Sequence, residues 1–150
     1  MQPHLKNDLL YLLRILEGAE KIMLYSRSYL TPLDLFSAND QKEFNACLNL
    51  LSQIGEQSNK LSQTIIEKHP ETDWVQIKGM RNRIVHDYTG IDLYIVFEII
   101  KRNIPELKIA IGDIIRLELY NGNFNKEEFA LAQTSPYLRH VDFALLMKED

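Results

Sequence analysis

The feature that most constrains the fold is a run of apolar residues at helical spacing near the N-terminus. From Leu5 to Met23 they recur every three or four residues, so they fall on one face of a helix. A second stripe of the same kind runs from Phe44 to Ile65. Both helices exceed the usual mean length, which favours an antiparallel helical bundle over a small mixed fold.

Breaks in these two patterns mark where the helices should end. The first helix should end near Tyr29, because the Thr-Pro pair at 31–32 begins a connector with room for one helical turn. Asn39 or Asp40 is placed to cap the second helix. That helix should then continue to the His-Pro pair at 69–70.

A third helix should carry the most polar segment of the chain. Asp73 and Gln76 have the spacing of an N-terminal capping pair, which starts this helix near Trp74. Gly90 is a suitable C-terminal stop. The helix between them contains the segment RNRIVHDY.

The remaining sequence predicts one more long helix and a less regular tail. Asp92 should cap the fourth helix, and Pro105 should kink or restart it. Beyond Arg116 the apolar pattern weakens. A helix stop at 121–125 should be followed by two short helices divided at 135–136. The expected fold is therefore all-α: an antiparallel four- to five-helix bundle with a C-terminal helical extension.

Composition excludes several classes of protein. A length of 150 residues suits one domain, and 45% apolar with 25% charged residues is an ordinary globular balance. No stretch has the ~20 apolar residues of a membrane span, and the N-terminus does not resemble a signal peptide. The only cysteine is Cys47, and no His-x-x-x-His pair occurs, so we expect no disulfide, metal site or cofactor. We therefore expect a cytoplasmic protein without membrane contact.

One eleven-residue segment concentrates the groups that bind phosphate and move protons near neutral pH. It reads KGMRNRIVHDY and has a net charge of +2 within a chain of net charge −4. The overall charge argues against a protein that coats nucleic acid, but a local basic site remains open. Guanidinium, amide, imidazole and phenol groups lie together here. The candidate residues are Lys78, Arg81, Asn82, Arg83, His86 and Tyr88.

Helical geometry separates the two strongest candidates. Arg81 and His86 would differ by about 140° around the helix axis and by about 7.5 Å along it. Asn82 and Arg83, in contrast, lie four and three residues before His86 and share its face. A two-fold dimer that brings two such helices together would join the guanidinium and imidazole groups. The spacing therefore favours a homodimer that forms through this helix.

Ordinary structural explanations remain open for these residues. Two arginines and a histidine on a helix can form a solvated face, and Tyr88 can be a partly buried aromatic residue. Gly55 sits mid-helix, where glycine costs about 1 kcal/mol relative to alanine. Close helix packing would explain that glycine. Alternatively, Glu56 beside it would orient an arginine or histidine of the third helix.

The segment Arg81-x-x-x-x-His86-x-Tyr88 resembles the signature of the HepT-like toxins of the HEPN superfamily. The segments at 54–62 and 69–108 also resemble that family, and the likeness covers about residues 7–115. It implies that residues 1–115 form a HEPN bundle that dimerises with its motif helices at the interface. Residues 116–150 would be a C-terminal extension packed on the same domain.

The resemblance also implies an activity. Family members are metal-independent endoribonucleases, and Arg81 and His86 would be the catalytic pair. In such a reaction the 2′-hydroxyl of RNA attacks the adjacent phosphate, with His86 as general base or acid and Arg81 holding the phosphate. Asn82, Arg83 and Glu56 would support this pair. The residues expected to contact RNA are Lys78 and Arg83.

The same resemblance implies partners. Members act as toxins in bacterial toxin–antitoxin pairs, where a minimal nucleotidyltransferase antitoxin transfers AMP to the motif tyrosine, here Tyr88. The expected partners are thus a second copy of the chain, the antitoxin, and an RNA substrate such as tRNA or mRNA. A non-catalytic helical module that binds a nucleotidyltransferase remains the alternative function.

Overall fold

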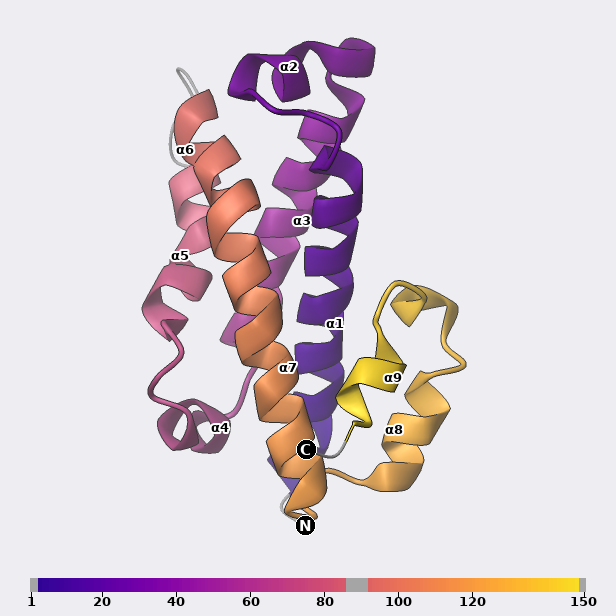
Figure 1. The fold of residues 1–150 in the computed structure, drawn as a ribbon. Helices are drawn as coiled ribbons and strands as arrows, with labels where there is room; N and C mark the ends of the chain where they lie inside the picture. The colour runs from indigo at the N-terminus through magenta and orange to yellow at the C-terminus, as the bar shows by residue number, and fades with distance from the viewer. Residues whose placement is uncertain (1–2, 86–91, 149–150) are drawn as a thin grey trace.

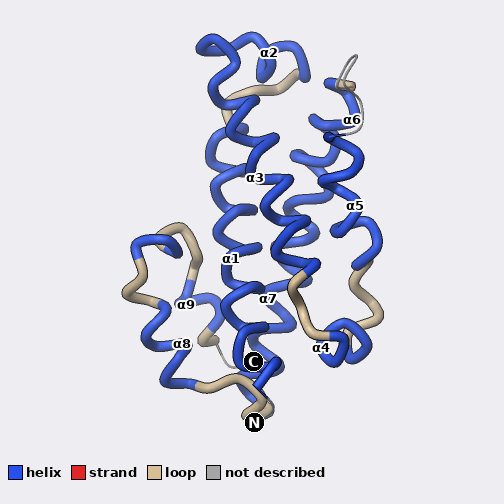
Figure 2. Tube along the Cα trace, turned by 180° about the vertical axis from the view of Figure 1, so that it is seen from behind, coloured by secondary structure: helices blue, strands red, loops and turns tan. Residues whose placement is uncertain are grey.

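The computed structural model describes residues 3–85 and 92–148, and every regular element in these ranges is helical (Figures 1 and 2). Helix α1 packs against α3 and α7, and α3 packs against α5. Successive long helices run in opposite directions along the bundle (Figure 1). The predicted all-α antiparallel bundle is therefore confirmed. Its principal helices are α1 (Pro3–Ser26), α3 (Lys42–Asn59), α5 (Trp74–Val85), α6 (Leu93–Glu98) and α7 (Ile104–Tyr120).

The apolar stripes of α1 and α3 form the centre of the core. Each stripe recurs at helical spacing and is withdrawn from solvent, as the sequence predicts. None of the described helices is both long and apolar enough to cross a bilayer. Fully buried side chains of the two helices include Leu12, Leu13, Ile15, Ile22, Leu51 and Ile54.

The connector after α1 contains the predicted helical turn but not the predicted cap. Helix α2 (Pro32–Ser37) begins after Thr31, whose hydroxyl accepts a hydrogen bond from the Asp34 backbone nitrogen (3.1 Å). The expectation that Asn39 or Asp40 caps α3 is wrong. Both residues take left-handed conformations in a 3-10 turn, so neither has the extended backbone of a capping residue.

The second predicted helix is interrupted, so the expectation of one helix as far as residue 69 is also wrong. Helix α3 ends at Asn59, and α4 (Gln63–Lys68) begins after Ser62. The buried Asp8 carboxylate of α1 accepts hydrogen bonds from the backbone nitrogen (2.8 Å) and hydroxyl of Ser62. Ser62 in turn caps α4 by accepting from the Ile65 nitrogen (3.2 Å). These bonds replace the helical ones and create the break.

The ends of the later helices follow the predicted capping residues. Asp73 accepts a hydrogen bond from the Gln76 backbone nitrogen (3.0 Å) at the start of α5. Asp92 caps α6 by accepting from the nitrogens of Tyr94 and Ile95. The predicted stop at Gly90 lies outside the described residues.

The predicted kink or restart of the helix near Pro105 is a π-helical turn just before this proline. A π-helical turn, Ile99–Asn103, joins α6 to α7, and Pro105 lies in the first turn of α7. Proline is tolerated there because the first backbone nitrogens of a helix have no intrahelical partner. Helices α6 and α7 therefore form one rod with an irregular turn in it.

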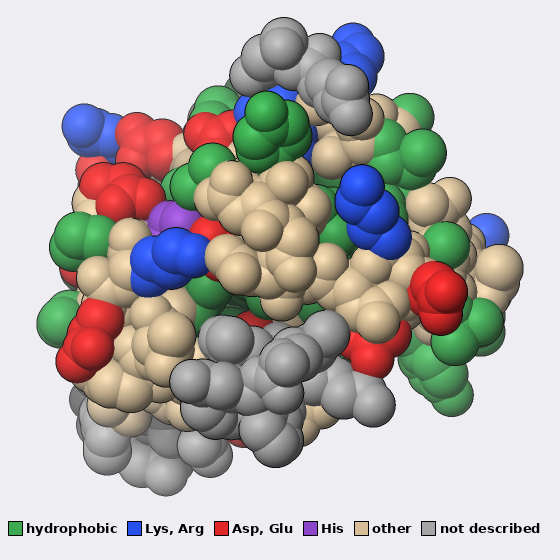
Figure 3. Space-filling view, turned by 90° about the horizontal axis from the view of Figure 1, so that it is seen from below, with side chains coloured by type: hydrophobic (Ala, Val, Ile, Leu, Met, Phe, Trp, Pro, Cys, Tyr) green, Lys and Arg blue, Asp and Glu red, His purple; other side chains and the backbone are tan. Residues whose placement is uncertain are grey.

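The C-terminal residues pack beside α1 and α7 at the lower end of the bundle (Figures 1 and 2). Gly122, with a φ of +77°, ends α7. Helix α8 (Lys126–Ala132) follows, as predicted. The second predicted short helix is instead divided into a 3-10 turn, Pro136–Leu138, and α9 (Phe143–Leu146). Acidic and basic side chains of described residues are interspersed on the face seen from this end (Figure 3).

Candidate functional site

Helix α5 carries the first part of the predicted motif, and its apolar residues fix its orientation. Ile77 and Met80 are buried in the core. At the start of the helix, the buried Trp74 indole donates a hydrogen bond to the His69 carbonyl oxygen (2.9 Å). The helix therefore presents a defined outer face, on which Val75 is 84% exposed.

The predicted site residues on this helix differ in how far the structure describes them. Asn82 is exposed and Lys78 is partly exposed, so both can reach a ligand in solvent. Arg81 and Arg83 belong to the last turns of α5, but their side chains lie outside the described part of the chain. His86 and Tyr88 also lie outside the described residues. The grouping of Arg81 with His86 therefore stays a prediction.

The two explanations for the mid-helix glycine of α3 can be compared with its surroundings. Gly55 is buried within α3, the helix that packs against α5. This agrees with a role in close helix packing. Glu56, next to it, is exposed on α3. Its orientation of a motif side chain stays a prediction, because the arginine and histidine concerned are not described.

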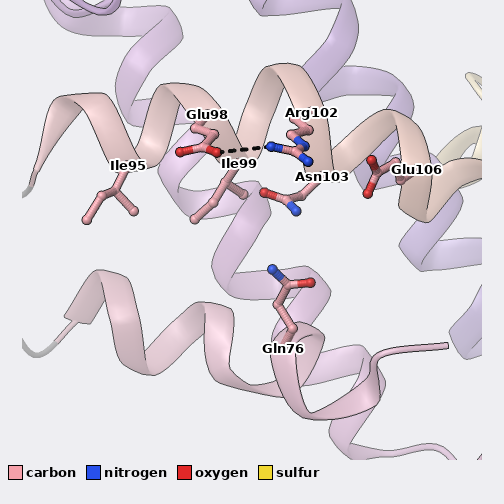
Figure 4. Close-up of a pocket in the computed structure, with 7 residues that line it drawn as sticks. All are labelled: Gln76, Ile95, Glu98, Ile99, Arg102, Asn103 and Glu106. Carbon is pink, nitrogen blue, oxygen red and sulfur yellow. Dashed lines mark ion pairs between the residues drawn. The ribbon is translucent and has the colours of Figure 1, made fainter.

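A groove lies between α5 and the rod formed by α6 and α7, with a volume of about 240 Å³ (Figure 4). From α5, Gln76 points across the groove toward Asn103 of the π turn (Figure 4). Glu98 and Arg102 form an ion pair on the rod, 3.6 Å apart. The rod contributes six lining residues: Ile95, Glu98, Ile99, Arg102, Asn103 and Glu106.

This groove is not predicted from the sequence. Gln76 is predicted only as a capping partner of Asp73, and Asn103 has no predicted role. The one related signal was Pro105, which marks the irregular turn that carries Asn103. Amphipathic spacing does not show which polar residues of two helices will face each other.

Two other polar groups in the bundle have shifted pKa values. Burial raises the pKa of the Cys47 thiol to about 11, with a further contribution from the Glu43 charge, so the thiol is neutral near pH 7. Burial lowers the pKa of Lys101, whose ammonium donates a hydrogen bond to the Ser26 carbonyl (2.7 Å). Neither group lines the groove. Within the described ranges, no cluster of three or more His, Cys, Asp or Glu side chains could hold a metal ion.

The helical bundle and its motif helix place the chain in a class of small α-helical domains with a basic, polar segment on one helix. Within that class, the chain belongs to the family described as ribonuclease HepT-like, whose sequence model matches residues 15–114. The match includes α5 and all the predicted site residues. It ends shortly before the end of α7 and leaves out the C-terminal extension.

Several named proteins are similar to the chain. One from Methanocaldococcus jannaschii, named "Putative RNase", is 30% identical over 98 residues, which are 65% of this chain and 87% of that protein. A protein of the same description from Caldanaerobacter subterraneus subsp. tengcongensis is 36% identical over 73 residues, 49% of this chain and 65% of that protein. A "Probable ribonuclease HepT" from Thermococcus cleftensis is 33% identical over 69 residues, 46% of this chain and 63% of that protein.

The chain thus spans slightly less than two thirds of the Caldanaerobacter and Thermococcus proteins. It spans most of the length of the Methanocaldococcus protein. No solved structure matches it. The family is therefore established from sequence.

Proposed function

We propose that the chain is a metal-independent endoribonuclease. The observation that carries the proposal is the family match over residues 15–114, which includes the segment Arg81-x-x-x-x-His86-x-Tyr88. The exposure of Asn82 supports it, because the start of this segment is open to a ligand.

In the proposed reaction the RNA supplies its own nucleophile. The 2′-hydroxyl oxygen attacks the adjacent phosphorus, the bond to the 5′-oxygen of the next nucleotide breaks, and a cyclic phosphate and a 5′-hydroxyl result. His86 accepts the proton of the 2′-hydroxyl or protonates the leaving oxygen, since an imidazole pKa near 6.5 suits either role. Such a group contributes roughly 10²–10⁴-fold in rate.

The other motif residues bind and orient the phosphate. Arg81 holds it through two parallel hydrogen bonds and offsets the charge that develops in the transition state. Asn82 orients the phosphate or the imidazole, and Lys78 and Arg83 contact flanking RNA. Glu56 orients one of the basic groups from α3.

A homodimer formed through α5 would complete this site. On a helix that continued to His86, Arg81 and His86 would be about 140° apart around the axis, so a second copy of the helix would bring the two groups together. We propose residues 1–115 as the dimerising bundle and residues 116–150 as an extension on the same domain.

The proposed biological role is that of a toxin in a toxin–antitoxin pair. A minimal nucleotidyltransferase antitoxin would transfer AMP to Tyr88, two residues from His86. The added anion and adenosine would block the site and repel the phosphates of RNA. The target would be a cellular RNA such as tRNA or mRNA.

Cleavage of purified RNA tests the proposed activity. The chain is incubated with total tRNA and mRNA in the presence of a chelator, beside the variants His86→Ala and Asn49→Leu. We expect cleavage by the wild type and by Asn49→Leu, whose changed residue is exposed on α3. We expect none by His86→Ala, and none of DNA, which lacks the 2′-hydroxyl. Equal cleavage by His86→Ala would show that the catalytic assignment is wrong.

The proposed silencing is tested separately. Expression of the chain should arrest growth, and co-expression of the nucleotidyltransferase should relieve the arrest for the wild type but not for Tyr88→Phe. A Tyr88→Phe chain that the partner still silences would exclude modification of this tyrosine as the mechanism.

A second candidate function is a non-catalytic module that binds a nucleotidyltransferase. Acidic and basic side chains are mixed at the lower end of the bundle, which argues against a broad nucleic-acid-binding surface there (Figure 3). A chain that binds the nucleotidyltransferase tightly but cleaves no RNA would support this second function.

A further inference from the structure

We propose that the groove between α5 and the α6–α7 rod binds one RNA base and prefers adenine or cytosine to uracil. This inference rests on the proposed ribonuclease function and deepens it, because it assigns sequence selectivity to residues outside the motif.

Two carboxamides face each other across the groove (Figure 4). Gln76 projects from the first turn of α5 and Asn103 from the π turn. Neither side chain makes a hydrogen bond to another described residue, and both are partly exposed. Each carboxamide offers both donors and an acceptor, which are the groups that read the edge of a base.

The charge of the groove distinguishes between a base and a phosphate. Glu98 and Glu106 line it, and the lining cation, Arg102, is already paired with Glu98 at 3.6 Å. A phosphate would therefore meet an excess of negative charge. A base is neutral, and its amino hydrogens can be donated to a carboxylate. The lining thus suits a base better than the RNA backbone.

The size of the groove limits the ligand. At about 240 Å³ it is smaller than the roughly 300–1,000 Å³ of pockets that enclose drug-sized ligands, so it suits a single ring system. The apolar side chain of Ile95, which is 41% exposed, is also in the lining, where it can contact the ring. The π turn at 99–103 moves Asn103 out of regular helical register, and such turns are frequent at functional sites.

The groove is close to the proposed catalytic residues. Gln76 precedes Arg81 by five residues of the same helix, about 7.5 Å along its axis and about 140° around it. Stacked nucleotides follow one another at about 3.4 Å, so this distance corresponds to roughly two nucleotides. Position 83 lies two turns beyond Gln76, on nearly the same face of α5. A strand bound at the motif can therefore place a neighbouring base in the groove.

The chemistry of the lining selects between bases. Asn or Gln side chains make paired hydrogen bonds with the amino group and N7 of adenine, and a carboxylate accepts from the amino group of cytosine. Uracil has a carbonyl oxygen in place of that amino group, which Glu98 or Glu106 would repel. Adenine and cytosine are therefore preferred over uracil.

The test measures binding apart from cleavage. Synthetic heptamers of adenylate, cytidylate and uridylate are titrated into the His86→Ala chain, with binding followed by fluorescence anisotropy. We expect the adenylate and cytidylate heptamers to bind about tenfold more tightly than the uridylate heptamer, since one good paired contact discriminates by that order. Adding Asn103→Leu or Gln76→Leu should reduce the preference for adenylate over uridylate to less than about twofold, because the carboxamides supply the paired contact with adenine. Glu106→Gln, which removes a lining carboxylate, should reduce the preference for cytidylate over uridylate in the same way.

Matched controls separate this effect from unfolding. Asn49→Leu makes the same side-chain change on the exposed surface of α3 and should leave the tenfold preference intact. In parallel, the side-chain amide NMR signals of Gln76 and Asn103 should shift on addition of AMP or CMP, and much less with UMP. Unchanged backbone signals in the variants would show that they are folded.

The outcomes distinguish the two proposals. If the wild type cleaves RNA but His86→Ala binds all three heptamers equally, the ribonuclease assignment stands and the base site is wrong. If the wild type cleaves nothing, yet binding prefers adenylate and loses that preference in Asn103→Leu, the base site stands and the catalytic proposal is wrong. A preference that survives both groove substitutions would overturn the base site.

Discussion

The bundle and the C-terminal extension are attached to their surroundings in different ways. The bundle is held by apolar stripes whose residues are almost wholly buried. The extension adds buried aromatic and aliphatic residues, but it also depends on two buried glutamates of the bundle, Glu17 of α1 and Glu118 of α7. The bundle is thus organised by hydrophobic spacing, whereas the extension combines buried apolar residues with specific polar contacts.

Glu17 connects α1 to the end of the extension. Its carboxylate accepts a hydrogen bond from the His140 backbone nitrogen (2.6 Å) and lies 2.7 Å from the Nδ1 atom of that histidine. Lys21 lies 3.5 Å from the same carboxylate. A buried carboxylate is costly unless it is paired, so these partners determine where the extension can dock.

Glu118 has the same role at the beginning of the extension. Its carboxylate accepts hydrogen bonds from Lys68 (2.9 Å) and from the Asn123 side chain (3.1 Å). The His69 Nε2 atom lies 3.5 Å away. Both anchors lack the periodic signal of an apolar stripe. The comparison shows that hydrophobic spacing builds the bundle, whereas isolated charged residues position the segment added to it.

The largest effect is expected for a cavity in the bundle. Leu51→Ala removes a fully buried side chain of α3 and should lower the free energy of unfolding by roughly 2–5 kcal/mol, as measured by urea denaturation. Leu131→Ala, in the extension, changes a residue that is 71% exposed and should cost less than about 0.5 kcal/mol. Equal losses in the two variants would contradict the place of Leu51 in the core.

A smaller and more local effect is expected for the polar anchor. Glu17→Ala leaves the His140 groups without their acceptor and should cost roughly 1–3 kcal/mol. Hydrogen exchange should accelerate in residues 136–146 while the amides of α3 stay protected. Glu127→Ala, an exposed control in α8, should change neither. Uniform acceleration across α3 and the extension would show that the two regions open as one unit.

The sequence predicts the elements whose physics is local. The stripes of α1 and α3 and the caps Asp73 and Asp92 are confirmed, because spacing and capping depend on residues close together in the chain. The break after Asn59 was not predicted, because it is made by Asp8, which lies 54 residues before Ser62. Contacts between distant segments of this kind leave no periodic trace.

The candidate site likewise has one part that the sequence predicts and one part that it does not. The motif is visible in the sequence because Arg81, His86 and Tyr88 lie close together in the chain, and the family match includes it. The groove was not predicted, because Gln76 of α5 and Asn103 of the π turn face each other only in the folded bundle. The role of Glu56 depends on side chains of a different helix and stays a prediction.

The buried thiol of Cys47 gives a third test. Burial raises the pKa of Cys47 from 9.0 to about 11, so the unfolded chain loses the thiol proton first as the pH rises. The associated stability is therefore complete well below pH 9 and is lost as the pH rises from 9 toward 11, by roughly 1 kcal/mol per pH unit. Denaturation at pH 9 and 10 should show this additional loss in the wild type relative to Cys47→Ala. Parallel pH dependences would contradict it.

The smallest effects are expected at two glycines, one in each region. A Cβ at Gly79 of α5 would meet no atom of a described residue within 4 Å, so Gly79→Ala should stabilise the bundle by up to about 1 kcal/mol through helix propensity. Gly122 has equally open surroundings but a φ of +77°, so Gly122→Ala should destabilise by roughly 1–2 kcal/mol. Urea denaturation of both variants measures the sign. An added Cβ meets no described neighbour at either site, so packing cannot account for a difference between the two variants. Stabilisation by Gly79→Ala together with destabilisation by Gly122→Ala would show that backbone conformation determines the cost at Gly122.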